Sequence, residues 1–320
     1  MNIYVLCPDL DTATGGIKML YRHVDILNAN GFSAAILHQQ EGFRCSWFDN
    51  QTAVAYVSNA SAGNIDYLVV PEIYGPGIAK LGKAIKKVIF NQNSYYTFKD
   101  YSLDKHDLTT PYVHKDTVAA LVVSENNKNY LQYVFPELPI FRVHYSVDRS
   151  LFKNDLPKRR QIAFMPRKNV EDVVQVINIL KFRNALRGYE LIPITGKNEV
   201  EVAAILRESL IFLSFGYPEG CPLPPMEAMA SGCITIGYDG MGGREYFTPE
   251  FAYPVAHGDI VAFARAVEEV IHLYEKNPES LNQKTQSASR FITGRYSAER
   301  EEKDAIDFWT ATINAAAAKG

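Results

Sequence analysis

The sequence predicts an α/β protein made of two Rossmann-like domains, each with a doubly wound parallel sheet, that face one another across a cleft. The chain has 320 residues, and a domain usually holds roughly 150. Short apolar runs alternate with segments of helical periodicity, which is typical of parallel βαβ units. The alternation stops at a polar stretch, residues 148–160, and then starts again. Ligands of such sheets bind beyond the carboxyl ends of the strands, so functional residues are expected in the loops that follow strands.

The first domain is expected to span residues 1–150. Its strands are expected at six apolar runs: 3–7, 33–38, 67–71, 87–91, 119–124 and 140–145. After the first run, Ile17, Leu20, Val24 and Leu27 recur at helical spacing. Gly31 follows this pattern and is expected to end the helix, because glycine readily adopts the left-handed conformation of a helix C-terminus.

The second domain is expected to span residues 151–296, followed by a C-terminal helix over 297–320, with 148–160 acting as the linker. The expected strands are 161–165, 190–194, 210–215 and 233–237, and the expected helices are 170–186, 200–208, 224–230 and 260–274. Pro224 and Pro225 suit the first turn of a helix, where a missing N–H group costs little. Gly232 suits the end of the same helix.

Composition excludes several classes of protein. With 47% hydrophobic and 22% charged residues, the chain is neither disordered nor collagen-like. A formal net charge of −3 gives no general attraction to nucleic acid or to an anionic membrane. Cys7, Cys45, Cys221 and Cys233 form no C-x-x-C pair, which fits a reducing cytoplasm. No apolar run reaches the ~18 residues of a membrane span, and the N-terminus lacks the basic region of a signal peptide.

The most informative segment is residues 219–232, E-G-C-P-L-P-P-M-E-A-M-A-S-G. Glu219 lies in the loop that follows an expected strand, and Glu227 is expected in the first turn of the next helix. Free backbone N–H groups are expected between them, facing the cleft. Carboxylates accept hydrogen bonds from sugar hydroxyls and amides donate to them, so this pattern favours a polyhydroxyl ligand.

The E-x7-E spacing, with E-A-M-A-x-G and an apolar strand after it, resembles retaining glycosyltransferases of family four, which have the glycosyltransferase-B fold. In that family the pattern recurs as EGFGLPPLEAMACG. The resemblance implies that Glu219 contacts the hydroxyls of the transferred sugar and that Glu227 holds the ribose of the nucleotide. The same loop would add Gly220, Cys221 and Leu223 as donor-binding residues. Pro222 departs from the family's usual glycine and removes one N–H donor.

Two further segments resemble the same family. Gly15 and Gly16 follow the first strand and open the first helix, like the family's glycine-rich loop. Glycine permits close backbone approach, and a helix N-terminus favours a phosphate. Arg167 and Lys168 follow the first strand of the second half, where the family binds the donor diphosphate with an Arg and a Lys a few residues apart. In this chain the two are adjacent, so one of them is free to point away. The final helix resembles the one that crosses back to the first domain.

The acceptor side is less complete. Many family members carry a His after the strand that here ends at Pro71, whereas this chain has Glu72. Residues 91–98, N-Q-N-S-Y-Y-T-F, follow the next strand. They offer amides for hydroxyls and aromatic rings for sugar stacking. The acceptor-side candidates are Glu72, Asn91, Gln92, Tyr95 and Tyr96.

Other patterns compete with this interpretation. Residues 77–84 nearly match a phosphate-binding G-x4-G-K-[ST] loop, but Ala84 replaces the hydroxyl, and the apolar spacing favours a helix with an exposed lysine face. Those lysines, Lys80, Lys83, Lys86 and Lys87, offer a weak peripheral contact with the inner membrane face or are simply solvated. Asp9 and Asp11 match the D-x-D metal site of the other major glycosyltransferase fold, and a glycosidase could use Glu219 and Glu227 as its acid–base pair.

The resemblance therefore implies a retaining, metal-independent glycosyltransferase of the hexosyltransferase class, with Glu219, Arg167 and Lys168 in catalytic roles. It would move a sugar from a nucleoside-diphosphate donor, its co-substrate, to a hydroxyl of a glycan, lipid or small molecule. No other cofactor, metal or nucleic acid is expected. The alternative is a non-catalytic sugar- or nucleotide-binding relative of the same fold.

Overall fold

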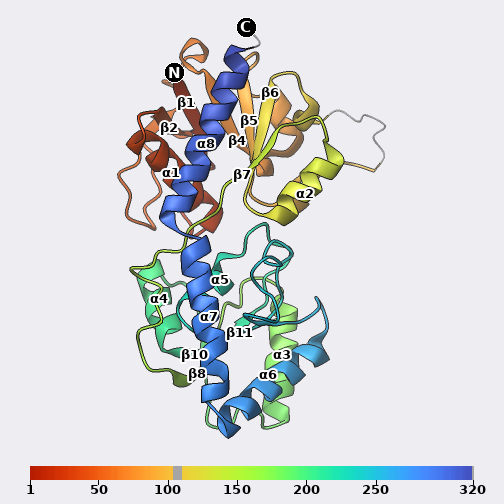
Figure 1. Cartoon of the computed structure of the whole chain (residues 1–320). Helices are drawn as coiled ribbons and strands as arrows, with labels where there is room; N and C mark the ends of the chain where they lie inside the picture. The colour runs from red at the N-terminus through yellow and green to blue at the C-terminus, as the bar shows by residue number, and fades with distance from the viewer. Residues whose placement is uncertain (104–109, 319–320) are drawn as a thin grey trace. The chain divides into compact units, whose positions relative to one another are not determined.

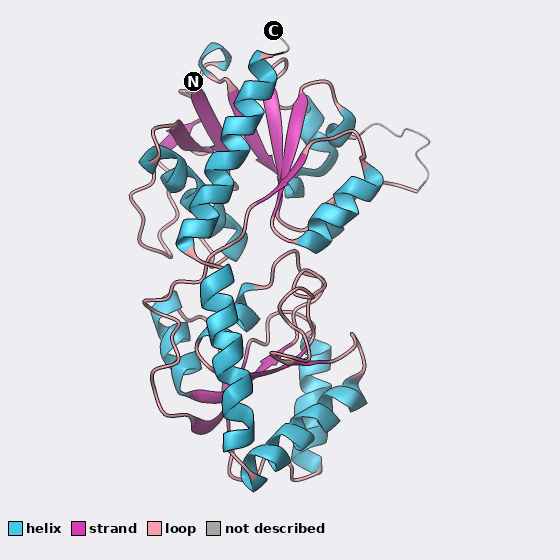
Figure 2. Cartoon of the chain, viewed as in Figure 1, coloured by secondary structure: helices cyan, strands magenta, loops and turns pink. Residues whose placement is uncertain are grey.

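The computed structural model describes residues 1–103 and 110–318, which form two compact units. Unit 1 comprises Met1–Tyr145 and Glu299–Gly320, and unit 2 comprises Ser146–Ala298. Each unit holds a parallel sheet with helices packed on its faces, shown by secondary structure in Figure 2. The prediction of two parallel α/β domains is confirmed. The division falls at residues 145/146, a few residues before the expected 150, and again at 298/299.

Unit 1 contains a seven-stranded parallel sheet with the order β3-β2-β1-β4-β5-β6-β7. Its strands are β1 (Asn2–Leu6), β2 (Ser33–His38), β3 (Val54–Tyr56), β4 (Tyr67–Pro71), β5 (Lys86–Asn91), β6 (Thr117–Val122) and β7 (Ile140–Arg142). Val5 of β1 pairs with Ile36 on one side and with Val69 on the other. The strand order reverses between β1 and β4, and this reversal is where doubly wound sheets bind their ligands.

Helices cover both faces of this sheet. The helices are α1 (Gly15–Ala29), α2 (Glu125–Val134) and α8 (Ala298–Ala317), with short 3-10 segments η1 (Ala62–Asn64), η2 (Glu72–Lys80), η3 (Ser94–Tyr96) and η4 (Pro111–Val113). The predicted apolar stripe of α1 is buried, and Gly31 has a positive φ of 80° just after the helix. One core cluster joins Leu68 and Val70 of β4 to Leu131 of α2.

The C-terminal helix α8 packs in unit 1, although it follows unit 2 in sequence (Figure 1). Trp309 is fully buried and its Nε1 donates to Nε2 of His23 on α1 at 2.9 Å. Arg22 on the same helix lies 2.8 Å from the buried Glu301 carboxylate. Contacts between residues nearly 300 positions apart thus attach the end of the chain to its beginning.

Unit 2 contains a five-stranded parallel sheet with the order β12-β11-β10-β8-β9. Its strands are β8 (Arg159–Phe164), β9 (Glu190–Pro193), β10 (Ser209–Ser214), β11 (Ile234–Gly237) and β12 (Tyr253–Pro254); its helices are α3 (Val170–Phe182), α4 (Glu199–Glu208), α5 (Leu223–Ala230), α6 (Ile260–Lys276) and α7 (Glu279–Arg295). Successive residues of β10 pack in two separate hydrophobic cores. Ile211 and Leu213 pack with α3 and α6, whereas Phe212 between them packs with α4, α5 and α7.

The polar stretch 148–160, expected to act as the linker, is mostly exposed but is attached to unit 2 by side chains such as those of Phe152 and Lys158. Phe152 is buried in the unit 2 core. Lys158 Nζ donates to the backbone carbonyls of Leu206, Arg207 and Ser231, near the C-termini of α4 and α5. A cation at this position satisfies the hydrogen-bonding capacity of helix-terminal carbonyls and interacts favourably with the negative end of the helix dipole.

Several local predictions need correction. Residues 77–84 do not form an α-helix. Residues 77–80 belong to the 3-10 segment η2, which is interrupted at Gly75 (φ 51°) and ends at Lys80. The helix expected over 170–186 ends at Phe182, and Asn184 then takes a positive φ of 56°. Helices α2 and α7 and the short strands β3 and β12 were not expected. Within the described parts of the chain, none of the helices combines the length and apolar character needed to cross a bilayer.

Candidate functional site

The strand order of unit 2 places the loops after β8 and β10 side by side. The chain passes from β8 to β9 on one side and then returns to β10 on the other, so the sheet reverses between β8 and β10. Lys168 follows β8, and Glu219 follows β10. Lys168 Nζ lies 2.7 Å from Glu219 Oε1, with the two side chains 32% and 22% exposed. Two predicted site residues thus form one ion pair at the expected edge, whereas the neighbouring Arg167 is exposed.

Asn169 joins the two loops that carry this pair, and the sequence analysis did not identify it. It precedes α3 in the left-handed conformation, with φ 49°. Its Nδ2 donates to the carbonyl of Phe215 at 2.6 Å and to that of Tyr217 at 3.3 Å. Asparagine adopts left-handed φ more readily than most residues. The sequence offered one signal for this residue, its position directly after the two basic residues Arg167 and Lys168.

The loop that begins at Glu219 is held by the segment after β11. The Glu219 amide donates to the Gly240 carbonyl at 2.8 Å, and the Gly242 amide donates to the Glu219 carbonyl at 3.1 Å. The hydroxyl of the buried Tyr246 donates to the Pro222 carbonyl at 2.6 Å. A Cβ on Gly242 would lie 1.9 Å from the Gly220 carbonyl oxygen, so only glycine allows this approach.

The bracing and the prolines together limit the free amides of this loop. The Glu219 amide is already used by Gly240, and Pro222, Pro224 and Pro225 have no N–H group. Two of the first four amide positions of α5 are therefore proline. A ligand here would meet fewer backbone donors and depend more on side chains.

Glu227 lies one residue further into its helix than expected. Because α5 begins at Leu223, Glu227 is its fifth residue and belongs to the second turn rather than the first. Leu223, Pro224 and Glu227 share the half-buried side of α5, while most of its other residues are buried. Glu227 is thus separated from Glu219 by the prolines that open the helix.

A small cavity of about 30 Å³ lies beside the ion pair and is walled by Arg167, Lys168, Gly216, Glu219 and Pro222, among others. This volume corresponds to about one water molecule. The cavity is thus small, while the two side chains of the pair remain partly exposed to solvent.

The carboxyl edge of the unit 1 sheet brings other predicted residues together. Gly15 and Gly16 open α1, and a Cβ on Gly16 would lie 3.2 Å from Gln92 Oε1. The same oxygen accepts a hydrogen bond from the Tyr145 hydroxyl at 2.5 Å. The start of α1 thus lies against the loop after β5, at the reversal of the strand order.

Glu72 is buried at this edge. Its side chain follows β4, the residue is 3% exposed, and Oε2 accepts the Gln92 amide at 3.0 Å. Burial raises the pKa of the Glu72 carboxyl to about 7, although backbone hydrogen bonds from Gln92 and its neighbours oppose the shift. A carboxyl that protonates near neutral pH therefore holds the loop that contains Gln92.

The remaining acceptor-side candidates differ in exposure. Asn91 is fully buried, and its Nδ2 donates to Thr97 Oγ1 and to the Tyr112 hydroxyl. Its Oδ1 has no hydrogen-bond partner among the described residues. Tyr95 and Tyr96 are half-buried in η3, and the Tyr95 hydroxyl donates to Asn126 Oδ1 at 3.2 Å. Asn91 belongs to an internal network, whereas Gln92, Tyr95 and Tyr96 retain exposed surface.

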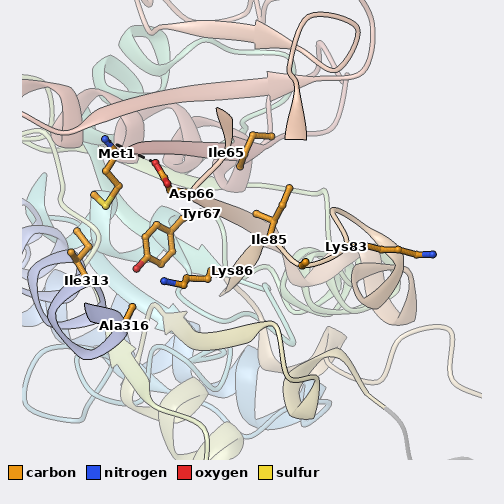
Figure 3. Close-up of a pocket in the computed structure, with 10 residues that line it drawn as sticks. Met1, Ile65, Asp66, Tyr67, Lys83, Ile85, Lys86, Ile313 and Ala316 are labelled. Atoms are coloured by element: carbon orange, nitrogen blue, oxygen red, sulfur yellow. Dashed lines mark ion pairs between the residues drawn. The ribbon is translucent and has the colours of Figure 1, made fainter. Parts of the chain in front are cut away.

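The lysines of residues 80–87 do not form a common exposed face. The side chain of Lys87 is 1% exposed and its Nζ lies 3.4 Å from Asp116 Oδ2. Lys86 Nζ lies 5.6 Å from the centre of the Tyr67 ring. Figure 3 shows Lys83 and Lys86 extending separately at a cavity of about 500 Å³, near Tyr67 and α8. The expected lysine-rich helical face, and the membrane contact built on it, are not supported.

The two aspartates of the D-x-D pattern are held by separate neighbours. Asp9 Oδ1 lies 2.8 Å from His38 Nδ1, and its Oδ2 accepts the Gln40 amide. Asp11 accepts hydrogen bonds from both the amide and the hydroxyl of Ser46. In the described residues, no group of three or more His, Cys, Asp or Glu side chains is arranged to hold a metal ion.

Comparison with known proteins identifies relatives of this chain. Residues 185–288 match the family model described as Glycosyl transferases group 1, a segment that contains Glu219 and Glu227 but not Arg167 or Lys168. The chain is 26% identical over 317 residues to an alpha-1,6-glucosyltransferase of Actinobacillus pleuropneumoniae serotype 7 (strain AP76), with 95% of this chain and 93% of that protein covered.

Solved structures are similar over nearly the whole chain. A sucrose-phosphate synthase from Thermosynechococcus elongatus superposes with a TM-score of 0.69 and 12% identity, covering 98% of this chain and 99% of that one. Anabaena HepE in complex with UDP and glucose superposes with a TM-score of 0.63 and 10% identity, covering 97% of this chain and 100% of that one. These similarities show that the chain has the glycosyltransferase-B fold.

Proposed function

We propose that this chain of glycosyltransferase-B fold is a retaining glycosyltransferase that moves a sugar, in the first instance a hexose, from a nucleoside diphosphate to an acceptor hydroxyl. The observation that carries the proposal is the pairing of Lys168 with Glu219 at the reversal point of the unit 2 sheet. The matched family segment and the glucosyltransferase relative support it independently. The acceptor is a glycan, a lipid or a small molecule.

The donor roles follow from charge and position. Arg167 and Lys168 would neutralise the leaving diphosphate, because cations beside a leaving group stabilise its developing charge. Glu219 would accept hydrogen bonds from the sugar hydroxyls, with help from the loop residues Gly220, Cys221 and Leu223. Glu227 would hold the ribose from the next helix. Gly15 and Gly16 at the start of α1 would let a phosphate or sugar approach the backbone closely.

In the proposed front-face reaction, the bond between the anomeric carbon and the donor phosphate breaks while the acceptor oxygen bonds to the same face of that carbon. The acceptor proton moves to the departing phosphate oxygen. No protein nucleophile or metal ion is required. On the acceptor side, Gln92, Tyr95 and Tyr96 would contact the acceptor, and the buried Glu72 and Asn91 would support the loop that carries them.

The cytoplasm is the proposed location. Cys7, Cys45 and Cys233 are buried free thiols in the structure. Free thiols are typical of a reducing compartment.

A second candidate is a donor-binding relative without turnover. Pro222 removes an amide from the sugar loop, and Glu219 is already engaged by Lys168. The two candidates differ in a single measurement, the release of nucleoside diphosphate from a donor.

The purified protein is expected to release nucleoside diphosphate from UDP-, ADP- or GDP-glucose in buffer that contains EDTA, because Arg167 and Lys168 take the place of a divalent ion. The α-anomeric configuration should be retained in the sugar product. The measurement is coupled nucleotide detection together with NMR of the anomeric proton. Loss of activity in EDTA with recovery in Mn²⁺ would contradict metal independence, and binding without release would favour the second candidate.

Replacing Glu227 with Gln is expected to weaken UDP binding about tenfold, or ~1.5 kcal/mol, because a charge-assisted hydrogen bond to the ribose is lost. Isothermal titration calorimetry measures the affinity. Glu208→Gln is a matched control, since Glu208 pairs with Arg159 on the exposed surface of the same unit. Equal UDP affinity in Glu227→Gln and Glu208→Gln would show that Glu227 does not hold the nucleotide.

A further inference from the structure

We infer that the Lys168–Glu219 ion pair is a closed state of the donor site, which the donor diphosphate opens by drawing Lys168 away from Glu219. The inference rests on the proposed function. It assigns the pair a second role, in which the enzyme distinguishes the complete donor from the nucleoside diphosphate that remains after transfer.

The geometry leaves no space for a phosphate between the two groups. Lys168 Nζ and Glu219 Oε1 are in direct contact at 2.7 Å, which is too short a distance for a phosphate oxygen to lie between them. A phosphate oxygen that takes the N–H group now directed at Glu219 must therefore displace the Glu219 carboxylate.

The backbone on both sides of the pair is braced, so opening requires side-chain movement alone. Asn169 bonds the turn after β8 to the carbonyls of Phe215 and Tyr217. The backbone of Glu219 bonds to Gly240 and Gly242 in both directions. Lysine has a long flexible side chain and three donors, which suits it to transfer from one anionic partner to another.

The exchange has opposite consequences for donor and product. A nucleotide sugar takes Lys168 with its diphosphate and offers Glu219 sugar hydroxyls in return. A nucleoside diphosphate takes Lys168 but leaves Glu219 without a replacement partner. After transfer, Glu219 regains Lys168 and weakens the hold on the diphosphate, so the pair favours product release. Binding energy that depends on the sugar is thereby reserved for the donor.

Removing the Glu219 charge should therefore tighten the binding of a nucleoside diphosphate. Partly exposed ion pairs have small coupling energies, which correspond to about a two- to fivefold change in affinity. We expect UDP to bind Glu219→Gln about two- to fivefold more tightly than it binds the wild type. In a Lys168→Gln background, where no ion pair exists to be broken, the same Glu219→Gln change should leave UDP affinity unchanged.

The experiment is calorimetric titration of UDP, ADP and GDP into four proteins: the wild type, Glu219→Gln, Lys168→Gln and the double variant. Glu268→Gln is the control for net charge, because Glu268 pairs with Arg183 elsewhere in unit 2, and its affinity should equal that of the wild type. Circular dichroism and thermal unfolding establish that each variant is folded.

Tighter binding by Glu219→Gln that disappears in the Lys168→Gln background supports the closed-pair inference. Unchanged or weaker binding by a folded Glu219→Gln protein overturns it. Equal tightening in both backgrounds also overturns it, because general repulsion between Glu219 and the diphosphate would then account for the effect. A wild-type protein that binds none of the three nucleotides overturns the proposed function itself, which is a distinct result.

Discussion

Replacing Glu219 with Gln is expected to lower turnover about a hundredfold while raising the Michaelis constant for the donor much less. The transferred sugar gains positive charge in the transition state, so a carboxylate that contacts its hydroxyls contributes more there than in the ground state. Loss of one such preorganised electrostatic contact typically costs 10²–10³-fold in rate, which makes about a hundredfold the expected size. Steady-state kinetics with the donor as the varied substrate separates the two constants.

Glu227→Gln is the matched comparison, since it changes the other carboxylate of the same segment. The ribose does not change during the reaction, so this variant should mainly raise the Michaelis constant. The two carboxylates are thus predicted to differ in the constant that they affect. Unchanged turnover in a folded Glu219→Gln protein that has lost diphosphate binding would show that Glu219 contacts the nucleotide rather than the sugar.

Replacing Glu72 with Gln is expected to remove a pH dependence of stability worth about 3 kcal/mol. Burial raises the pKa of this carboxyl from 4.5 to about 7 in the folded protein. Between these values the native state binds more protons than the unfolded state, so the free energy of unfolding falls as pH rises. The Glu72 contribution is fully present below the unfolded pKa and is lost as pH passes through about 7.

Urea unfolding of the wild type and Glu72→Gln at pH 5 and pH 8 measures this effect. The variant keeps an oxygen that can accept the Gln92 amide, and it should lose less stability than the wild type between the two pH values. Glu137→Gln, at an exposed position of the same unit, should follow the wild type. Parallel pH profiles for Glu72→Gln and the wild type would mean that Glu72 is ionised in the folded protein throughout this range.

Most strands could be predicted because strands of a covered parallel sheet are buried on both faces and appear as continuous apolar runs. Residues 67–71 illustrate this, since all five are buried in β4. The elements that were missed lack such a signal. Only Asn127 and Leu131 of α2 are buried, and β12 has two residues. For α7, the buried residues recur at helical spacing but include a threonine and an alanine.

Lys87 shows how a local pattern can mislead. Three of the four lysines between residues 80 and 87 could have shared an exposed helical face. Lys87 instead donates a hydrogen bond to Asp116, which lies 29 residues later in the chain. The pairing of β5 with β6 brings the two residues close together. The partner that permits burial of a charge was not visible in the surrounding sequence.

For the candidate site, the sequence by itself determined the chemical groups and the strand that each group follows. Lys168 comes after one apolar run and Glu219 after another, and the carboxyl ends of parallel strands share an edge. Only the tertiary structure decided that β8 and β10 are neighbours, that Lys168 and Glu219 touch, and that Asn169 and Gly242 hold the two loops. Periodicity and turn chemistry act over a few residues, whereas these contacts join residues that are far apart in the chain. They depend on strand order, which is decided by the packing of the whole unit.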